Sequence, residues 1–190
     1  MLPTAVDQKK RNKRDRLLRS ALELFLEKGP ASTSIDDIVQ RAGVAKGTFY
    51  LYFKDRNDIL EDLVVREGSR LVAESFLHAR SRHPATPDEE ILMAVREVLK
   101  KLKAAPELLI LIHRNLSWSQ ISRRLSASEA GGEDCCRLAR GRSPEEFRNL
   151  SFMILELVFS VAYSSIILGE PTGIDEMEPC LLDAVARLLR

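Results

Sequence analysis

The chain is poor in the residue types that carry most catalytic and metal chemistry. Its 190 residues include three cysteines, three histidines and one tryptophan, and only 6% are aromatic. No acid or nucleophile stands in register with His78, His83 or His113 to form a catalytic set. The sequence also lacks a G-x-S-x-G elbow, a P-loop, a Gly-rich dinucleotide turn and metal-spaced His/Cys clusters. We therefore expect a protein that is not an enzyme and that has no metal site and no cofactor.

Cysteine is too scarce for a disulfide framework. The three cysteines are an odd number, and two of them, Cys135 and Cys136, are adjacent. The N-terminus is polar and basic and lacks the apolar stretch of a secretory signal. Together these features favour a cytoplasmic protein. Because Arg137 and Arg140 would favour a thiolate nearby, sensing of oxidants or soft metals by the cysteine pair is a minor alternative.

The alternating pattern of half-buried strands is absent, whereas apolar residues at three- and four-residue spacing run through the chain. A hydrophobic content of 45% is sufficient for a core. We therefore predict an all-α fold of about nine helices. The one long apolar run, residues 150–168, is about long enough to span a bilayer. Glu156 and several serines within it favour a buried helix of a soluble bundle, and we expect no membrane contact.

Caps, prolines and glycines set the expected helix limits. Ser34 or Thr33 caps one helix, Asp55 or Asn57 caps another, and Gly43 and Gly169 act as stops. Thr86-Pro87 and Ser143-Pro144 are two further helix starts, each with acidic residues in the first turn. The expected helices cover residues 9–28, 35–42, a short stretch after Val44, 55 or 57 to 82, 87–103, 106 onward, 118–125, 144–168, and 174 or 178 to 189.

Charge is unevenly distributed although the net charge is only +1. Residues 1–56 contain 12 Lys/Arg and 7 Asp/Glu, whereas residues 57–190 contain 17 and 21. This asymmetry suggests a basic, nucleic-acid-binding face on a nearly neutral body. The densest basic stretch, from Lys9 to Arg16, is expected to lie along phosphates; a solvated helix start or a disordered tail is the alternative.

Residues 42–53 read AGVAKGTFYLYF and are the most informative segment. Gly43 lies where the chain reverses between two short helices, and glycine adopts a positive φ without steric cost. Phe49 and Phe53 are four residues apart and are expected to face inward, which leaves Lys46 and its neighbours on the outer side. A lysine followed by the hydroxyl side chains of Thr48, Tyr50 and Tyr52 suits phosphate oxygens and base edges. The segment therefore predicts a helix-turn-helix that holds duplex DNA.

The segment from Arg11 to Leu63 resembles the DNA-binding domain of tetracycline-repressor (TetR) family regulators. The matching features, in order, are a basic first helix, Gly29, TSIDDIVQRAG and VAKGTFYLYFKDRNDIL. Beyond Leu63 the resemblance is one of length and helical layout only. It implies a three-helix DNA-binding domain at residues 1–56 and a helical ligand-binding and dimerisation domain at residues 57–190.

The expected DNA contacts come from the basic first helix, the start of the second helix, and the third helix with its flanks. They are Lys10, Arg11, Arg14, Thr33, Ser34, Val44, Ala45, Lys46, Gly47, Thr48, Tyr50, Tyr52 and Lys54. Lys46 brings a charge for phosphates or for guanine acceptors. Gly47 has no side chain and would let the backbone come close to the DNA. The Thr and Tyr hydroxyls fix register on phosphates more than they read sequence.

The resemblance also implies a homodimer, because family members pair their last two long helices into a four-helix bundle. Both C-terminal helices are apolar around more of their circumference than one core needs. Candidate interface residues are Leu157, Val161, Leu181, Leu182, Val185 and Leu189, and the alternative is that both helices are simply core. A dimer would bind two half-sites of a palindromic operator.

A pocket for a small-molecule inducer is implied by the resemblance and not by any motif. Candidate residues are polar or aromatic side chains that interrupt apolar helices: Phe76, Met93, His113, Trp118, Phe152, Glu156, Phe159 and Tyr163. For Glu156, an ion pair with Arg114, Arg123 or Arg148 is an alternative of equal weight. For His113 and Trp118, ordinary helix or core positions are favoured.

These features together predict a repressor that is released from its operator by an inducer. A DNA-binding regulator controlled by a protein partner or by cysteine redox state is the alternative.

Overall fold

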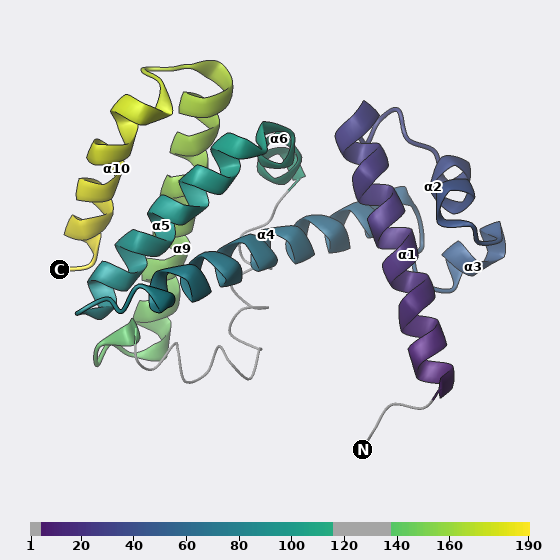
Figure 1. Ribbon diagram of the computed structural model, residues 1–190, viewed down its shortest axis with the longest axis horizontal. Coiled ribbons are helices and arrows are strands. Elements are labelled where there is room, and N and C mark those ends of the chain that lie inside the picture. The colour runs from purple at the N-terminus through teal and green to yellow at the C-terminus, as the bar shows by residue number, and fades with distance from the viewer. Residues whose placement is uncertain (1–4, 116–137) are drawn as a thin grey trace. The chain divides into compact units, whose positions relative to one another are not determined.

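The computed structural model describes residues 5–115 and 138–190, with side chains described from Lys10 onward. Within these ranges the regular structure consists of eight α-helices and one π-helix, without a strand (Figure 1). The expectation of an all-α fold is confirmed. Trp118, Arg123, Cys135, Cys136, Arg137 and the helix expected over residues 118–125 lie outside the described residues.

The chain divides into two compact units, one ending at Val64 and the other beginning at Val65. The first unit contains α1 (Ala5–Lys28), α2 (Ile35–Ala42), α3 (Lys46–Tyr50) and the beginning of α4 (Arg56–Ser81). Its buried core includes Leu17, Ala21, Ile38, Phe49, Phe53, Ile59 and Leu63. Phe49 and Phe53 therefore face inward as predicted. The functional division at residue 56, which is the first residue of α4, stays a prediction.

Local side-chain hydrogen bonds explain where the helices of this unit begin. Ser34 caps α2: its hydroxyl accepts from the Asp37 N–H, and the Asp37 carboxylate accepts from the Ser34 N–H at 2.8 Å. Thr33, the competing candidate, is only 1% exposed and donates its hydroxyl to the Gly29 carbonyl at 2.9 Å. Asp55 begins α4, because its Oδ1 accepts from the N–H groups of Asn57 and Asp58. These contacts satisfy amide groups that the first turn leaves unpaired.

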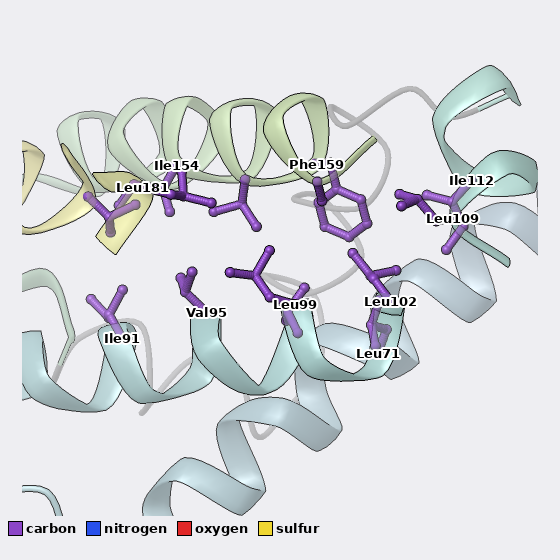
Figure 2. Packing of buried hydrophobic residues seen from close by; sticks show 14 of the residues in the cluster. Leu71, Ile91, Val95, Leu99, Leu102, Leu109, Ile112, Ile154, Phe159 and Leu181 are labelled. Carbon is purple, nitrogen blue, oxygen red and sulfur yellow. The ribbon is translucent and has the colours of Figure 1, made fainter. Parts of the chain in front are cut away.

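The second unit contains the rest of α4 together with α5 (Pro87–Ala104), α6 (Pro106–Asn115), α9 (Pro144–Ala162), a π-helix, η1 (Tyr163–Leu168), and α10 (Ile174–Leu188). Thr86 and Ser143 cap α5 and α9 with proline at the first helical position, as predicted. Figure 2 shows Val95, Leu99 and Leu102 of α5 facing α9 across the core, with Leu109 and Ile112 of α6 near Phe159. Burial of this cluster is the main stabilising contribution to the unit.

The apolar helix expected over residues 144–168 differs from the prediction in its last six residues, which form η1. The π-helix η1 ends at Gly169, which was predicted as the stop and has the left-handed φ of +70°. Within Pro144–Leu168, an 18-residue window has a mean hydropathy of 1.9, so this stretch is long and apolar enough to cross a membrane, and 33% of that window is buried. The buried side packs against α5 and α10, as in a core helix, and the remaining apolar surface faces outward.

Candidate functional site

The turn between α2 and α3 is held by backbone conformation and by an arginine from α1. Gly43 has a φ of +60°, and its N–H donates to the Gln40 carbonyl at 3.2 Å. The Arg16 guanidinium donates to the carbonyl of Ala42 and to that of Gly43, the latter at 3.1 Å. Carbonyls that the end of α2 leaves unpaired are thereby satisfied. The turn thus has a fixed geometry, and α3 projects from it in a defined direction.

Replacing Gly43 by alanine is expected to lower the free energy of unfolding by about 1–2 kcal/mol, because a Cβ is disfavoured at positive φ. That Cβ would also lie 2.9 Å from the Arg16 guanidinium and push it off the carbonyls. Urea denaturation followed by circular dichroism measures the change. The matched control is Gly47→Ala, since a Cβ on helical Gly47 meets no atom within 4 Å in the described ranges of the chain. Equal stability changes for the two variants would contradict the strained turn.

α3 is shorter than the two turns expected, since it comprises five residues and ends before Tyr52. Its outer side carries Lys46, Gly47 and Tyr50, all exposed, with Thr48 half-buried. Tyr50 packs edge-on against buried Phe49, with ring centroids 5.5 Å apart, and this contact fixes the direction of its hydroxyl. Leu51 is also exposed, which sequence reasoning missed; an apolar side chain there suits a thymine methyl group.

Lys46 has a partner within the unit. Its ammonium lies 2.8 Å from Asp36 Oδ1 and 3.0 Å from Oδ2, and this hydrogen bond raises the pKa of Lys46. Asp36 lies in the first turn of α2, and both side chains are exposed. The lysine expected to contact DNA is therefore held by a carboxylate on the neighbouring helix.

Other basic side chains of the first unit also make internal contacts. Arg14 pairs with Asp62 at 2.6 Å and lies over the Phe53 ring, 5.6 Å from its centroid. Arg41 pairs with Glu27, and Arg56 donates to the carbonyls of Ala31 and Thr33. Lys28 pairs with Asp37, and this contact with the capping hydrogen bonds holds the pKa of Asp37 far below its usual range.

Besides Lys46 and the cap Ser34, two further residues expected to contact DNA have contacts within the unit, and their part in DNA binding stays a prediction. Arg14 joins α1 to α4, and the hydroxyl of Thr33 is buried. Exposed basic side chains remain at the start of α1 and after α3, namely Lys10, Arg11, Lys13 and Lys54.

In the second unit the structure brings together two of the residues expected to bind a ligand. The rings of His113 on α6 and Tyr163 in η1 stack at 3.9 Å with an interplanar angle of 10°. Ser165, in the same π-helix, is buried, and its hydroxyl has no hydrogen-bond partner among the residues that the structure describes, a feature the sequence did not indicate. π-Helical turns occur often at functional sites.

The other candidate ligand residues are spread over the unit. Phe159 is buried in the hydrophobic core, Phe76, Met93 and Glu156 are half-buried, and Phe152 is exposed. Phe76, Phe159 and Tyr163 lie in or against the same hydrophobic cluster, and the ligand role of the whole set stays a prediction.

The candidate dimer residues fall into two groups. Leu181, Val185 and Leu189 recur every four residues, face the unit's own core and are buried in the single chain, so they are unavailable to a second copy. Leu157, Val161 and Leu182 are half-buried. The apolar side chains that α9, η1 and α10 do expose are Phe152, Met153, Leu168 and Leu188.

Comparison with known proteins places the helix-turn-helix segment within a described family. Residues 17–63 match the profile described as "Bacterial regulatory proteins, tetR family". The chain is 48% identical to the uncharacterized HTH-type transcriptional regulator YvdT of Bacillus subtilis over 48 residues, 25% of each chain. It is 33% identical to the HTH-type transcriptional regulator AcrR of Shigella flexneri over 92 residues, covering 48% of this chain and 40% of AcrR.

A longer match joins the chain to the fatty acid metabolism regulator protein of Bacillus subtilis. The two are 27% identical over 122 residues, which cover 64% of this chain and 62% of that protein. The chain thus spans less than two thirds of the length of each of these relatives.

Solved structures share the fold over nearly the whole chain. The fatty acid degradation regulator FadR from Bacillus halodurans aligns with a TM-score of 0.62 at 20% identity, covering 90% of this chain and 97% of that one. FadR from Bacillus subtilis, solved in complex with stearoyl-CoA, aligns with a TM-score of 0.61 at 18% identity and the same coverage. At these identities the likeness concerns the fold alone.

Proposed function

Because this chain belongs to the TetR family of transcriptional regulators, we propose that it is a dimeric repressor that binds a palindromic operator through α3 and is released by a small molecule. The observation that carries the proposal is the outer face of α3, where Lys46, Gly47 and Tyr50 are exposed on a turn of fixed geometry. The N-terminal end of such a helix meets the major groove in helix-turn-helix proteins. The named relatives are regulators of transcription, and we assign no catalytic role to the chain.

A homodimer is supported by the apolar surface that the second unit exposes along α9. Phe152 is 41% exposed and Met153 is 47% exposed, next to each other on this helix. Large apolar side chains grouped on a surface favour burial against a second copy. A dimer would also present two copies of α3 to the two halves of a symmetric operator. The protein would act in the cytoplasm, where bacterial DNA lies.

The second unit is the proposed site of control. The His113–Tyr163 stack and the unpartnered Ser165 hydroxyl place polar groups beside the apolar core at η1. An apolar pocket with a few polar groups is the usual form of a small-molecule site. Since the FadR of Bacillus subtilis has been solved with stearoyl-CoA, this compound is the first probe to use.

Selection from a random duplex library tests the DNA-binding half of the proposal. Purified protein is incubated with random 30-base-pair duplexes at about 100 mM salt, where phosphate contacts still contribute strongly. We expect enrichment of an inverted repeat whose half-sites are centred about one helical turn, or a multiple of it, apart. Enrichment of no sequence, or of a single asymmetric half-site, would contradict a repressor acting as a dimer through α3.

Glu156→Gln tests whether this half-buried carboxylate of α9 faces the ligand. Because stearoyl-CoA is an anion, loss of the negative charge is expected to lower the concentration that releases the selected duplex by about tenfold. DNA affinity without ligand should not change. Glu145→Gln, at the exposed start of the same helix, is the matched control.

If Glu156→Gln released the duplex at the same stearoyl-CoA concentration as the wild type, Glu156 would not face the ligand. No release by stearoyl-CoA or by other small molecules would favour control by a protein partner or by thiol oxidation.

A further inference from the structure

Asp36 is placed to regulate the lysine that α3 presents to DNA. Its neighbour Asp37 is used in the α2 capping box and by Lys28. Within the described part of the chain Asp36 makes no capping contact, and both of its carboxylate oxygens lie within 3.0 Å of the Lys46 ammonium. The pair is open to solvent, with the lysine side chain 54% exposed and the aspartate side chain 70% exposed. A phosphate that approaches Lys46 must therefore compete with Asp36.

We propose that Asp36 is a specificity-determining residue, which withholds Lys46 from DNA of the wrong sequence and releases it at the operator. The inference rests on the proposed function, because it requires that α3 enters the major groove. It concerns a residue that lies outside α3 and carries the same sign of charge as DNA.

The competition between carboxylate and phosphate explains how discrimination would arise. An exposed ion pair contributes only about 0–1 kcal/mol, so Lys46 can exchange partners readily. On DNA of the wrong sequence, the Lys46 ammonium gains little by exchanging the Asp36 carboxylate for a DNA phosphate. The Asp36 carboxylate also repels nearby phosphates. At the operator the remaining contacts fix α3 in the groove, where Lys46 can donate to guanine O6 and N7. Asp36 competes with DNA for Lys46 and is displaced only in the complex with the operator. It therefore lowers the affinity for other sequences more than the affinity for the operator, which raises specificity.

Removal of the Asp36 charge should therefore favour the wrong DNA. We expect Asp36→Asn to tighten binding to a scrambled duplex about three- to tenfold and to steepen its salt dependence by about 0.9, the slope of one added phosphate contact. The ratio of dissociation constants between scrambled and selected duplexes should fall by a similar factor. Both duplexes are measured by fluorescence anisotropy, with the selected sequence taken from the random library.

Two further variants distinguish this role from a simple change of net charge. Glu61→Gln removes the same charge from an exposed position on α4 in the same unit and should leave the ratio unchanged. In the double variant Asp36→Asn/Lys46→Met the gain on scrambled DNA should disappear, because it acts through the lysine.

Equal effects of Asp36→Asn and Glu61→Gln, or a gain that persists without Lys46, would overturn the proposal. A wild-type protein that binds neither duplex would overturn the proposed function and the role of Asp36 with it. Binding of both duplexes with no change in their ratio would overturn the role of Asp36 alone.

Discussion

Gly47→Val is expected to weaken binding to the selected duplex by about 100-fold or more, equivalent to the loss of one or two good base or phosphate contacts. A Cβ at Gly47 meets no atom of the described residues within 4 Å, so the domain has room for the larger side chain. Gly47 is exposed in the first turn of α3, and the proposed interface requires the backbone there to come close to the DNA. The added methyl groups would hold α3 away from the groove.

Anisotropy on the selected duplex measures this loss, and circular dichroism and sedimentation velocity test whether the variant keeps the fold and the oligomeric state of the wild type. Gly173→Val is the matched control, since a Cβ at Gly173 also meets nothing within 4 Å and the position lies in the second unit. We expect the control to bind DNA as the wild type does. Normal DNA binding by Gly47→Val would remove α3 from close contact with the duplex.

The double variant Phe152→Glu/Met153→Glu is expected to be a folded monomer at micromolar concentration. Both side chains are exposed on α9 in the single chain, so the substitutions disturb little within it. In a symmetric dimer every substitution occurs twice, and each buried, unpaired carboxylate costs several kcal/mol. Sedimentation velocity measures the change in mass, and DNA binding should fall because each monomer holds only one half-site.

Val185→Glu distinguishes loss of the dimer from loss of the fold. Val185 is fully buried in the core of the single chain, and a charge there should unfold the second unit. Leu77→Glu, at an exposed apolar position on α4, is the surface control and should stay dimeric. If the Phe152→Glu/Met153→Glu variant remained a dimer, the interface would have to lie elsewhere on the molecule.

Local signals in the sequence were sufficient to predict much of the fold. α2 spans Ile35–Ala42 as predicted, because a serine cap and a glycine stop act within one turn of the helix they limit. The predicted helix start at Ser143-Pro144 and the predicted helix stop at Gly169 are correct for the same reason. The exchange to π-helical hydrogen bonding after Ala162 was missed, because YSSIIL fits an α-helix equally well and packing decides between the two.

The roles of charged and apolar side chains were harder to predict, because they depend on residues distant in sequence. Arg14 is occupied by Asp62, 48 residues away, and the partner of Lys46 lies ten residues away on another helix. On α10 the leucine and valine side chains predicted an apolar helix, and Leu181 and Val185 are indeed buried. The pattern did not indicate that Val185 would face the chain's own core instead of a second copy.

The internal contacts of Arg14, Arg16, Lys28, Arg41 and Arg56 also affect how fast such a protein would find its target. Residence time on random DNA grows with the number of cations free to displace counterions. When a cation is paired with a carboxylate or carbonyl of its own domain, it gains less from each new phosphate contact, because the internal partner must first be displaced. Such a domain is held weakly at each wrong site. Its search of a chromosome would then consist of many brief encounters separated by dissociation, with little sliding, and cellular salt would slow it less than it slows more basic proteins.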